Sequence, residues 1–209
     1  MNIYLNGCVQ KSMQPPRVPS VYKHRYEKDS FSTLNAVGLA TLPDVIKPLL
    51  SSNHTTRLRT TIDVDPKRKS TADLPILARI CKVRLADLDI YSPHTVFDLR
   101  LSINIEVDLN NRDDIEPSLI VVPSEQEKDP QPARHKNRLS YKHCAYAIDL
   151  TQVTFEGSDK KTHEMEVEVD AVKLRQHASL LKEGRPNAYE QLVKGLVDNC
   201  VLLMRVKGE

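Results

Sequence analysis

The segment SPHTVFDLRLSINIEVDL, residues 92–109, alternates apolar and polar side chains along most of its length. Its apolar set is Phe97, Leu99, Leu101, Ile103, Ile105 and Val107, and its polar set is Asp98, Arg100, Ser102, Asn104, Glu106 and Asp108. Because successive side chains of a strand point to opposite faces, this period of two predicts a long strand with one apolar and one charged face. The fold should therefore be built from strands whose two faces differ sharply in polarity.

The same alternation recurs on both sides of this segment. It is present in four further stretches, residues 55–64, 76–90, 136–143 and 144–155. We expect an α+β fold of mainly antiparallel strands, either an open sheet with one wet face or a closed barrel with a polar lumen. Near the end, residues 187–204 carry an apolar stripe at helical spacing, which predicts a helix packed against the sheet.

The N-terminal part of the chain lacks this clear alternation. Pro15, Pro16 and Pro19 break regular structure, and a basic, aromatic run over residues 22–28 follows them. We therefore expect residues 1–35 to be an irregular segment and residues 36–209 to form the main domain.

A row of carboxylates lies in THEMEVEVDAV, residues 162–172, where Glu164, Glu166, Glu168 and Asp170 alternate with apolar residues. On one face of a strand such neighbours lie roughly 7 Å apart and repel by about 2.4 kcal/mol at an effective dielectric near 20. An open wet face tolerates this repulsion, whereas an enclosed face needs cations. The other strands supply candidate cations at Arg57, Arg59, Lys82, Arg84, Lys136 and Arg138.

Opposed cationic and anionic faces suit a phosphate chain bound together with a divalent ion. Basic side chains bind phosphate oxygens through charge-assisted hydrogen bonds, and carboxylates bind Mg²⁺ or Mn²⁺. The sequence contains no P-loop, no H-E-x-x-H and no G-x-S-x-G motif, so those classes of hydrolase are not indicated.

The amino-acid composition narrows the remaining classes of function. The net charge of the 209 residues is only +2 and Trp is absent, so neither a broad basic field nor base stacking is indicated. Cys8, Cys81, Cys144 and Cys200 are widely spaced, which favours a reducing compartment. The apolar runs are too short to span a bilayer and no secretory signal is recognisable, so we expect no membrane association.

Three blocks, residues 79–106, 134–154 and 163–169, resemble the fungal-type RNA 5′-triphosphatases. These are beta subunits of mRNA-capping enzymes within the triphosphate tunnel metalloenzyme superfamily, and the likeness covers about residues 55–206. It implies an eight-stranded antiparallel tunnel with a polar lumen and a C-terminal helix outside. It also implies Mg²⁺- or Mn²⁺-dependent removal of the γ-phosphate from 5′-triphosphate ends of nascent mRNA, the first step of cap formation. The implied location is the nucleus and the implied partner is the mRNA guanylyltransferase, or alpha subunit; a homodimer stays an alternative to a monomer.

The resemblance and the charged strand faces together give a set of candidate site residues. The catalytic carboxylates are Glu106, Asp149, Glu164, Glu166 and Glu168, of which Glu166 and Glu168 are the expected metal ligands. The substrate-binding cations are Arg57, Arg59, Lys82, Arg84, Lys136 and Arg138, with Lys136 and Arg138 matching the basic pair that contacts the triphosphate.

One departure from the family pattern stands out. The family carries a metal-binding E-x-E on its first tunnel strand, but residues 1–54 contain a single glutamate, Glu27. This leaves a chain whose first tunnel strand is lost or lies upstream of Met1. It also leaves an alternative function, that of a non-catalytic tunnel-fold subunit that binds guanylyltransferase or RNA. A hydrolase of free polyphosphate or thiamine triphosphate is a third reading, which the blocks at 79–106 and 134–154 disfavour.

Overall fold

The computed structural model describes residues 1–13, 18–50, 57–67, 74–95, 97–110, 120–121 and 131–205. Its strands are β1 (Val21–Leu34), β2 (Arg57–Asp63), β3 (Ile76–Ile90), β4 (Leu99–Asp108), β5 (Ile120–Val121), β6 (Arg134–His143), β7 (Tyr146–Phe155) and β8 (Lys161–Val169). Its helices are α1 (Asn2–Ser12), α2 (Ala36–Ala40), the 3₁₀ turn η1 (Lys47–Leu49), α3 (Ala171–Lys182) and α4 (Tyr189–Met204).

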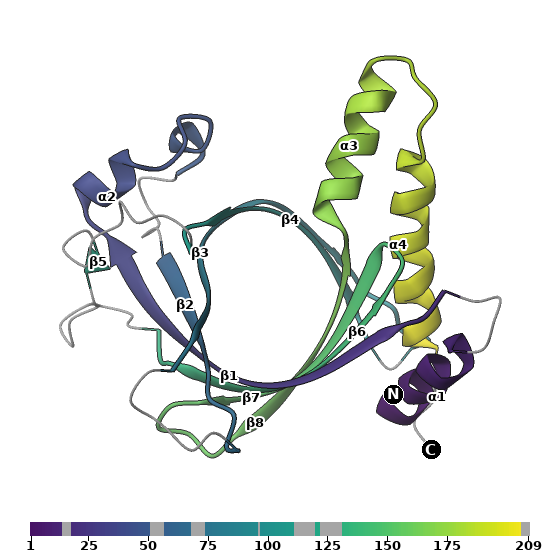
Figure 1. Cartoon of the computed structure of the whole chain (residues 1–209), viewed down its shortest axis with the longest axis horizontal. Helices are drawn as coiled ribbons and strands as arrows, with labels where there is room; N and C mark the ends of the chain where they lie inside the picture. The colour runs from purple at the N-terminus through teal and green to yellow at the C-terminus, as the bar shows by residue number, and fades with distance from the viewer. Residues whose placement is uncertain are drawn as a thin grey trace.

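The strands form one antiparallel sheet in the order β4-β3-β2-β1-β6-β7-β8, and β5 pairs with the end of β1. Figure 1 shows this sheet curling strongly, so that β4 arches back toward the side of β6 and β8. The prediction of a mainly antiparallel α+β fold is confirmed. Within the described residues no pairing joins the edge strands β4 and β8, so the structure shows a half-barrel and leaves the closed tunnel a prediction.

Apolar side chains gather on the outside of the curl in two clusters. The first joins Leu58 of β2 and Cys81 of β3 to Leu34, Leu42 and Leu109, so residues 36–50 cover this part of the sheet. The second joins Tyr141 of β6 to Leu5 of α1 and Leu203 of α4, with apolar residues of β7 and β8 packed around them. Burial of these outer faces stabilises the fold and turns the opposite, charged faces inward.

The predicted C-terminal helix is confirmed as α4, outside the sheet, but the helix before it was not predicted (Figure 1). Strand β8 ends at Val169, and the Asp170 carboxylate accepts backbone N–H bonds from Val172 and Lys173 at 3.0 and 3.1 Å. Asp170 therefore begins α3 as its N-cap, and its assignment to the carboxylate row of β8 was wrong. None of the helices in the described ranges is long and apolar enough to cross a membrane.

Residues 1–35 contradict the prediction of an irregular segment. Residues 2–12 form α1, and residues 21–34 form β1, which lies between β2 and β6 in the middle of the sheet. The sequence pattern did not predict β1 because the first half of this strand is polar on both faces. Tyr22 and His24 on the outer face are exposed, and Arg25 on the other face is charged. Strand β1 is therefore a central strand of the sheet that the sequence pattern did not predict.

Candidate active site

The register of the sheet places the predicted site residues on one face, called here the inner face. On β2, Arg57 and Arg59 share a face with Thr61, which lies opposite Asp29 of β1. On β3 and β4, Lys82 lies opposite Glu106, while the neighbouring Cys81 points into the outer cluster. On β6, β7 and β8 the remaining members follow at alternate positions: Lys136, Arg138, Asp149, Glu164, Glu166 and Glu168. The period-two reading of the charged faces is thus confirmed as a shared surface.

The centre of the inner face is an acidic pair on β1 that the sequence reading missed. Glu27 and Asp29 are two residues apart and are only 4 % and 0 % exposed. The ammonium Nζ of Lys136, itself buried, lies 3.0 Å from Glu27 Oε2 and 2.9 Å from Asp29 Oδ2. One lysine of β6 therefore bridges both carboxylates and offsets their mutual repulsion.

Further groups engage the oxygens of this pair. Thr61 donates its hydroxyl to Asp29 Oδ1 at 2.7 Å, Arg134 Nη2 lies 2.9 Å from Asp29 Oδ2, and Arg25 Nε lies 3.3 Å from Glu27 Oε1. Burial alone would raise the pKa of Asp29, but the charge of Lys136 and the Thr61 hydrogen bond outweigh it and lower the pKa. Asp29 is therefore ionised at neutral pH.

Arg138 links three strands across the inner face. Its Nη1 donates to Asp149 Oδ2 of β7 at 2.8 Å, its Nε lies 3.6 Å from Glu27 Oε2 of β1, and its Nη2 lies 3.8 Å from Glu166 Oε2 of β8. The side chain is 18 % exposed, so the guanidinium is held by these carboxylates rather than by bulk water. Arg138 is thus the cation that balances the acidic side of the site.

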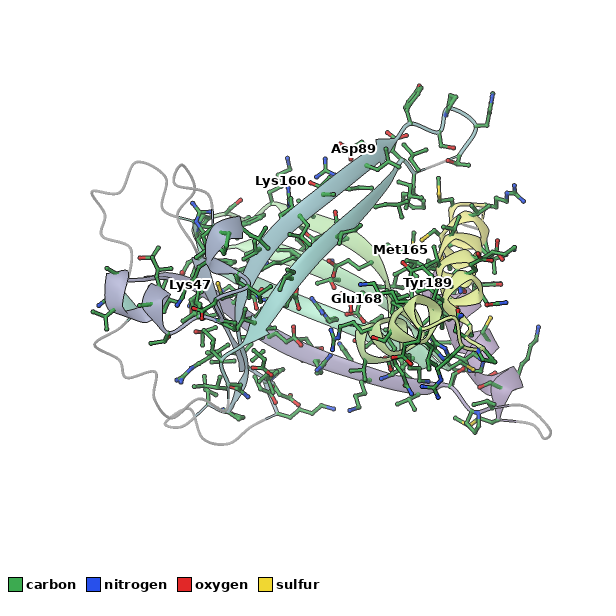
Figure 2. The ribbon with its side chains drawn as sticks, turned by 90° about the horizontal axis from the view of Figure 1, so that it is seen from above. Lys47, Asp89, Lys160, Met165, Glu168 and Tyr189 are labelled. Atoms are coloured by element: carbon green, nitrogen blue, oxygen red, sulfur yellow. The ribbon has the colours of Figure 1, made fainter. Side chains whose placement is uncertain are left out.

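Strand β8 separates apolar and acidic side chains onto its two faces. Met165 packs in the outer cluster, whereas Glu168 points into the space between β8 and β4 (Figure 2). Enclosure by the curled sheet, and the negative charges of Glu166, Asp149 and Glu106, raise the pKa of Glu168, and nearby Arg138 only partly opposes them. The side chain still reaches solvent. Because Glu106 lies on the opposite edge strand, the acidic residues of both edges face one another.

The raised pKa of Glu168 gives a testable pH dependence. Its pKa is higher in the folded chain than in the unfolded chain, so the ionised carboxylate destabilises the fold as the pH rises through the interval between the two values. Glu168→Gln should therefore raise the free energy of unfolding of the metal-free protein at about pH 7.5, and the gain should shrink toward about pH 4. Urea unfolding in EDTA at several pH values measures this, and a loss of stability at neutral pH would contradict it.

The other predicted residues line the same face with looser contacts. Lys82 Nζ lies 3.2 Å from Glu106 Oε1, with both side chains nearly half exposed. Arg84 Nη1 pairs with Asp87 Oδ2 at 3.0 Å. Arg57 Nη1 donates to Gln131 Oε1 at 2.8 Å. These contacts surround the central cluster and are separate from its buried ion pairs. Glu164 lies opposite Thr151 of β7.

Several arginines of the inner face keep unused hydrogen-bonding capacity. The Nε–H donors of Arg59, Arg134 and Arg138 are buried and have no hydrogen-bond acceptor among the described residues. Leaving buried donors unpaired is costly, so native structures rarely do so without a purpose. An anion with several oxygens, placed between these arginines, is the kind of ligand that would satisfy them.

The profile of a protein family described as "mRNA capping enzyme, beta chain" matches residues 1–207. The chain belongs to this family. The mRNA-capping enzyme subunit beta of Schizosaccharomyces pombe is 29 % identical over 209 residues, which are 98 % of this chain and 57 % of that protein. The corresponding subunit of Candida albicans is 31 % identical over 150 residues, covering 70 % of this chain and 26 % of that protein. The chain thus spans little more than half the length of the first of these capping-enzyme beta chains and less of the second.

A solved structure agrees with the sequence comparison. The S. pombe Pct1 RNA triphosphatase in complex with the Spt5 CTD superposes with a TM-score of 0.69 at 27 % identity. The match covers 99 % of this chain and 67 % of that one. The half-barrel of this capping-enzyme beta chain is therefore the fold of a known RNA triphosphatase, and its N-terminal α1 and β1 are part of the shared region.

The inner face also has to be tested as a site for the divalent ion that the family resemblance implies. Within the described ranges, no three His, Cys, Asp or Glu side chains come close enough together to hold a metal. The donors nevertheless fit in kind, because hard divalent ions prefer carboxylate oxygens, and a cation would relieve the repulsion from Glu166, Asp149 and Glu106 that raises the pKa of Glu168. Glu27 and Asp29 of β1 and Glu168 of β8 offer such oxygens on the inner face.

The residues missed by the sequence reading have the spacing of the expected carboxylate pair. Glu27 and Asp29, separated by Lys28, give a carboxylate pair at the spacing of the expected E-x-E, but the second carboxylate belongs to an aspartate. Searching for carboxylates of either kind at a spacing of two would have found the pair. Thr61 and Arg134 carried no comparable signal, because their roles depend on which strands become neighbours.

Proposed function

We propose that this chain removes the γ-phosphate from 5′-triphosphate ends of nascent mRNA in a reaction that depends on Mg²⁺ or Mn²⁺. The observation that carries the proposal is the pairing of buried carboxylates with arginines whose Nε–H donors lack acceptors among the described residues. An acidic pair alone would suit a metal, and an arginine cluster alone would suit an anion. Carboxylates and arginines that alternate on one concave surface suit a phosphate chain and a metal ion bound together.

The basic residues of the inner face bind the triphosphate in this proposal. Lys136 and Arg138 of β6 and Arg59 of β2 approach the chain of phosphates from two strands, on either side of β1. Their fixed positive charges stabilise the charge that spreads over the γ-phosphate oxygens in the transition state. Lys82 and Arg84 extend this basic lining along β3.

The acidic residues supply the metal ligands and orient water. A divalent ion bound by Glu27, Asp29 and Glu168 would neutralise phosphate charge and polarise the γ-phosphate. Glu166 is accessible, with its side chain 47 % exposed, and Arg138 lies beside it, so we assign it to orient the attacking water. Water attacks the γ-phosphorus, the bond to the β,γ-bridging oxygen breaks, and inorganic phosphate and a diphosphate-ended RNA are released.

Phosphate release tests the proposal. The purified chain should release inorganic phosphate from RNA labelled at the γ-position, with Mn²⁺ or Mg²⁺ but not in EDTA. Unlabelled triphosphate-ended RNA should compete better than inorganic tripolyphosphate or thiamine triphosphate. Release at background level by a folded chain would contradict the proposal and favour a non-catalytic subunit.

The buried carboxylates of β1 support the catalytic proposal over that alternative. A non-catalytic role was suggested by a missing carboxylate pair, and Glu27 and Asp29 provide one on β1. Nuclear location and binding to the mRNA guanylyltransferase are proposals that follow from family membership. Because the S. pombe relative was solved in complex with the Spt5 CTD, we propose a similar partner for this chain. The homodimer stays a prediction.

A further inference from the structure

We propose that Lys136 and the divalent ion exchange places at the Glu27–Asp29 pair, so that metal binding releases the Lys136 ammonium to bind phosphate. This inference rests on the proposed function and adds a coupling that the function itself does not require. It concerns how the site changes between its metal-free and its loaded state.

Lys136 lies between the two carboxylates of the pair. Its ammonium lies 3.0 Å from Glu27 and 2.9 Å from Asp29, and its side chain is only 4 % exposed. It occupies the space between the two carboxylates from which a metal ion would have to be bound. A divalent ion and an ammonium group repel one another strongly at this range, so the two cations cannot share the pair.

Lys136 differs from the other cations around the Glu27–Asp29 pair. Arg25, Arg134 and Arg138 each approach one of the two carboxylates from the rim, with side chains 42 %, 20 % and 18 % exposed. Lys136 alone among the described residues contacts both carboxylates. Metal binding therefore requires its departure.

The released Lys136 ammonium would find a phosphate-binding position on the same inner face. Lys136 and Arg138 alternate on β6, and on the same inner face the buried Nε–H donors of Arg59 and Arg134 have no hydrogen-bond acceptor among the described residues. A phosphate bound there would accept hydrogen bonds from the arginines and from the displaced lysine. Metal and anion should then each strengthen the binding of the other, as thermodynamic linkage requires.

Metal affinity of a lysine variant tests the exchange. Lys136→Met should bind Mn²⁺ about tenfold or more tightly than the wild-type chain, measured by isothermal titration calorimetry, because a competing cation is gone. Lys28→Met is the matched control: this lysine lies between Glu27 and Asp29 in the sequence but pairs on the outer face with exposed Glu156 at 3.1 Å. Its Mn²⁺ affinity should stay within about twofold of wild type. Equal or weaker binding by Lys136→Met would overturn the exchange, because a lysine that merely held the carboxylates in place would give that result.

A second measurement uses the wild-type chain and tests the coupling of metal and anion binding even when Lys136→Met does not fold. Sulfate, used as a weak-chelating anion with a protein-free titration as reference, should strengthen Mn²⁺ binding to the wild-type chain several-fold. An unchanged or weaker affinity would overturn the coupling. A wild-type chain that releases phosphate and binds Mn²⁺ without either effect would overturn the exchange alone. A wild-type chain that neither binds Mn²⁺ nor releases phosphate would overturn the proposed function as well.

Discussion

Glu27→Gln is expected to lower metal-dependent phosphate release by about 100-fold or more. Glu27 is 4 % exposed and contacts Lys136 and Arg138, so its charge acts on both the proposed metal site and the proposed phosphate site. Glutamine keeps the shape of the side chain but offers one neutral oxygen. The loss should appear in the turnover rate at saturating Mn²⁺ and also as weaker Mn²⁺ binding.

The matched control for this variant is Glu156→Gln. Glu156 is an exposed glutamate that pairs with Lys28, the neighbour of Glu27 on the outer face of the sheet. Its replacement should leave phosphate release within about twofold of wild type, because an exposed ion pair contributes little. Equal losses from both variants, or full activity of Glu27→Gln, would show that β1 does not carry the metal-binding pair.

Arg138→Leu is expected to lower the free energy of unfolding of the metal-free chain by about 3 kcal/mol. The guanidinium balances Asp149, Glu27 and Glu166 from three strands, and its removal leaves these carboxylates facing one another. Removing one partner of a buried ion pair is costly because the remaining charge is left uncompensated. Urea unfolding in EDTA measures the loss, and Mn²⁺ should restore part of it.

Arg84→Leu is the comparison for this variant. Arg84 also lies on the inner face and pairs with Asp87, but its side chain is 64 % exposed. We expect a loss of less than about 1 kcal/mol. A loss from Arg138→Leu that is as small as that from Arg84→Leu would mean that the Arg138 contacts do not stabilise the site.

The sequence predicted those strands whose faces differ in polarity. Strand β3 was expected over residues 76–90 and is found there, because its apolar residues alternate with charged ones. Predicted cations such as Lys136 and predicted carboxylates such as Glu166 share the inner face for the same reason. The alternation of polar and apolar residues determines which residues share a face. A strand can therefore be predicted from the sequence where one of its faces is buried against an apolar layer.

Sequence reading failed where that contrast disappears. Strand β1 is polar on both faces over its first half, because its inner residues build the site and outer residues such as His24 meet solvent. Helix α3 was missed because Asp170 continued the acidic alternation of β8, although its carboxylate caps a helix. The bridge from Lys136 to Glu27 and Asp29 depends on β1 lying beside β6, which is a property of topology and not of local pattern.

A crystal structure of the chain with Mn²⁺ and inorganic tripolyphosphate tests the central claim most directly. The anomalous signal of Mn²⁺ should lie about 2 Å from carboxylate oxygens of Glu27, Asp29 and Glu168, with the phosphates against Lys136 and Arg138. Mn²⁺ bound elsewhere, or tripolyphosphate bound on the outer face of the sheet, would contradict the account.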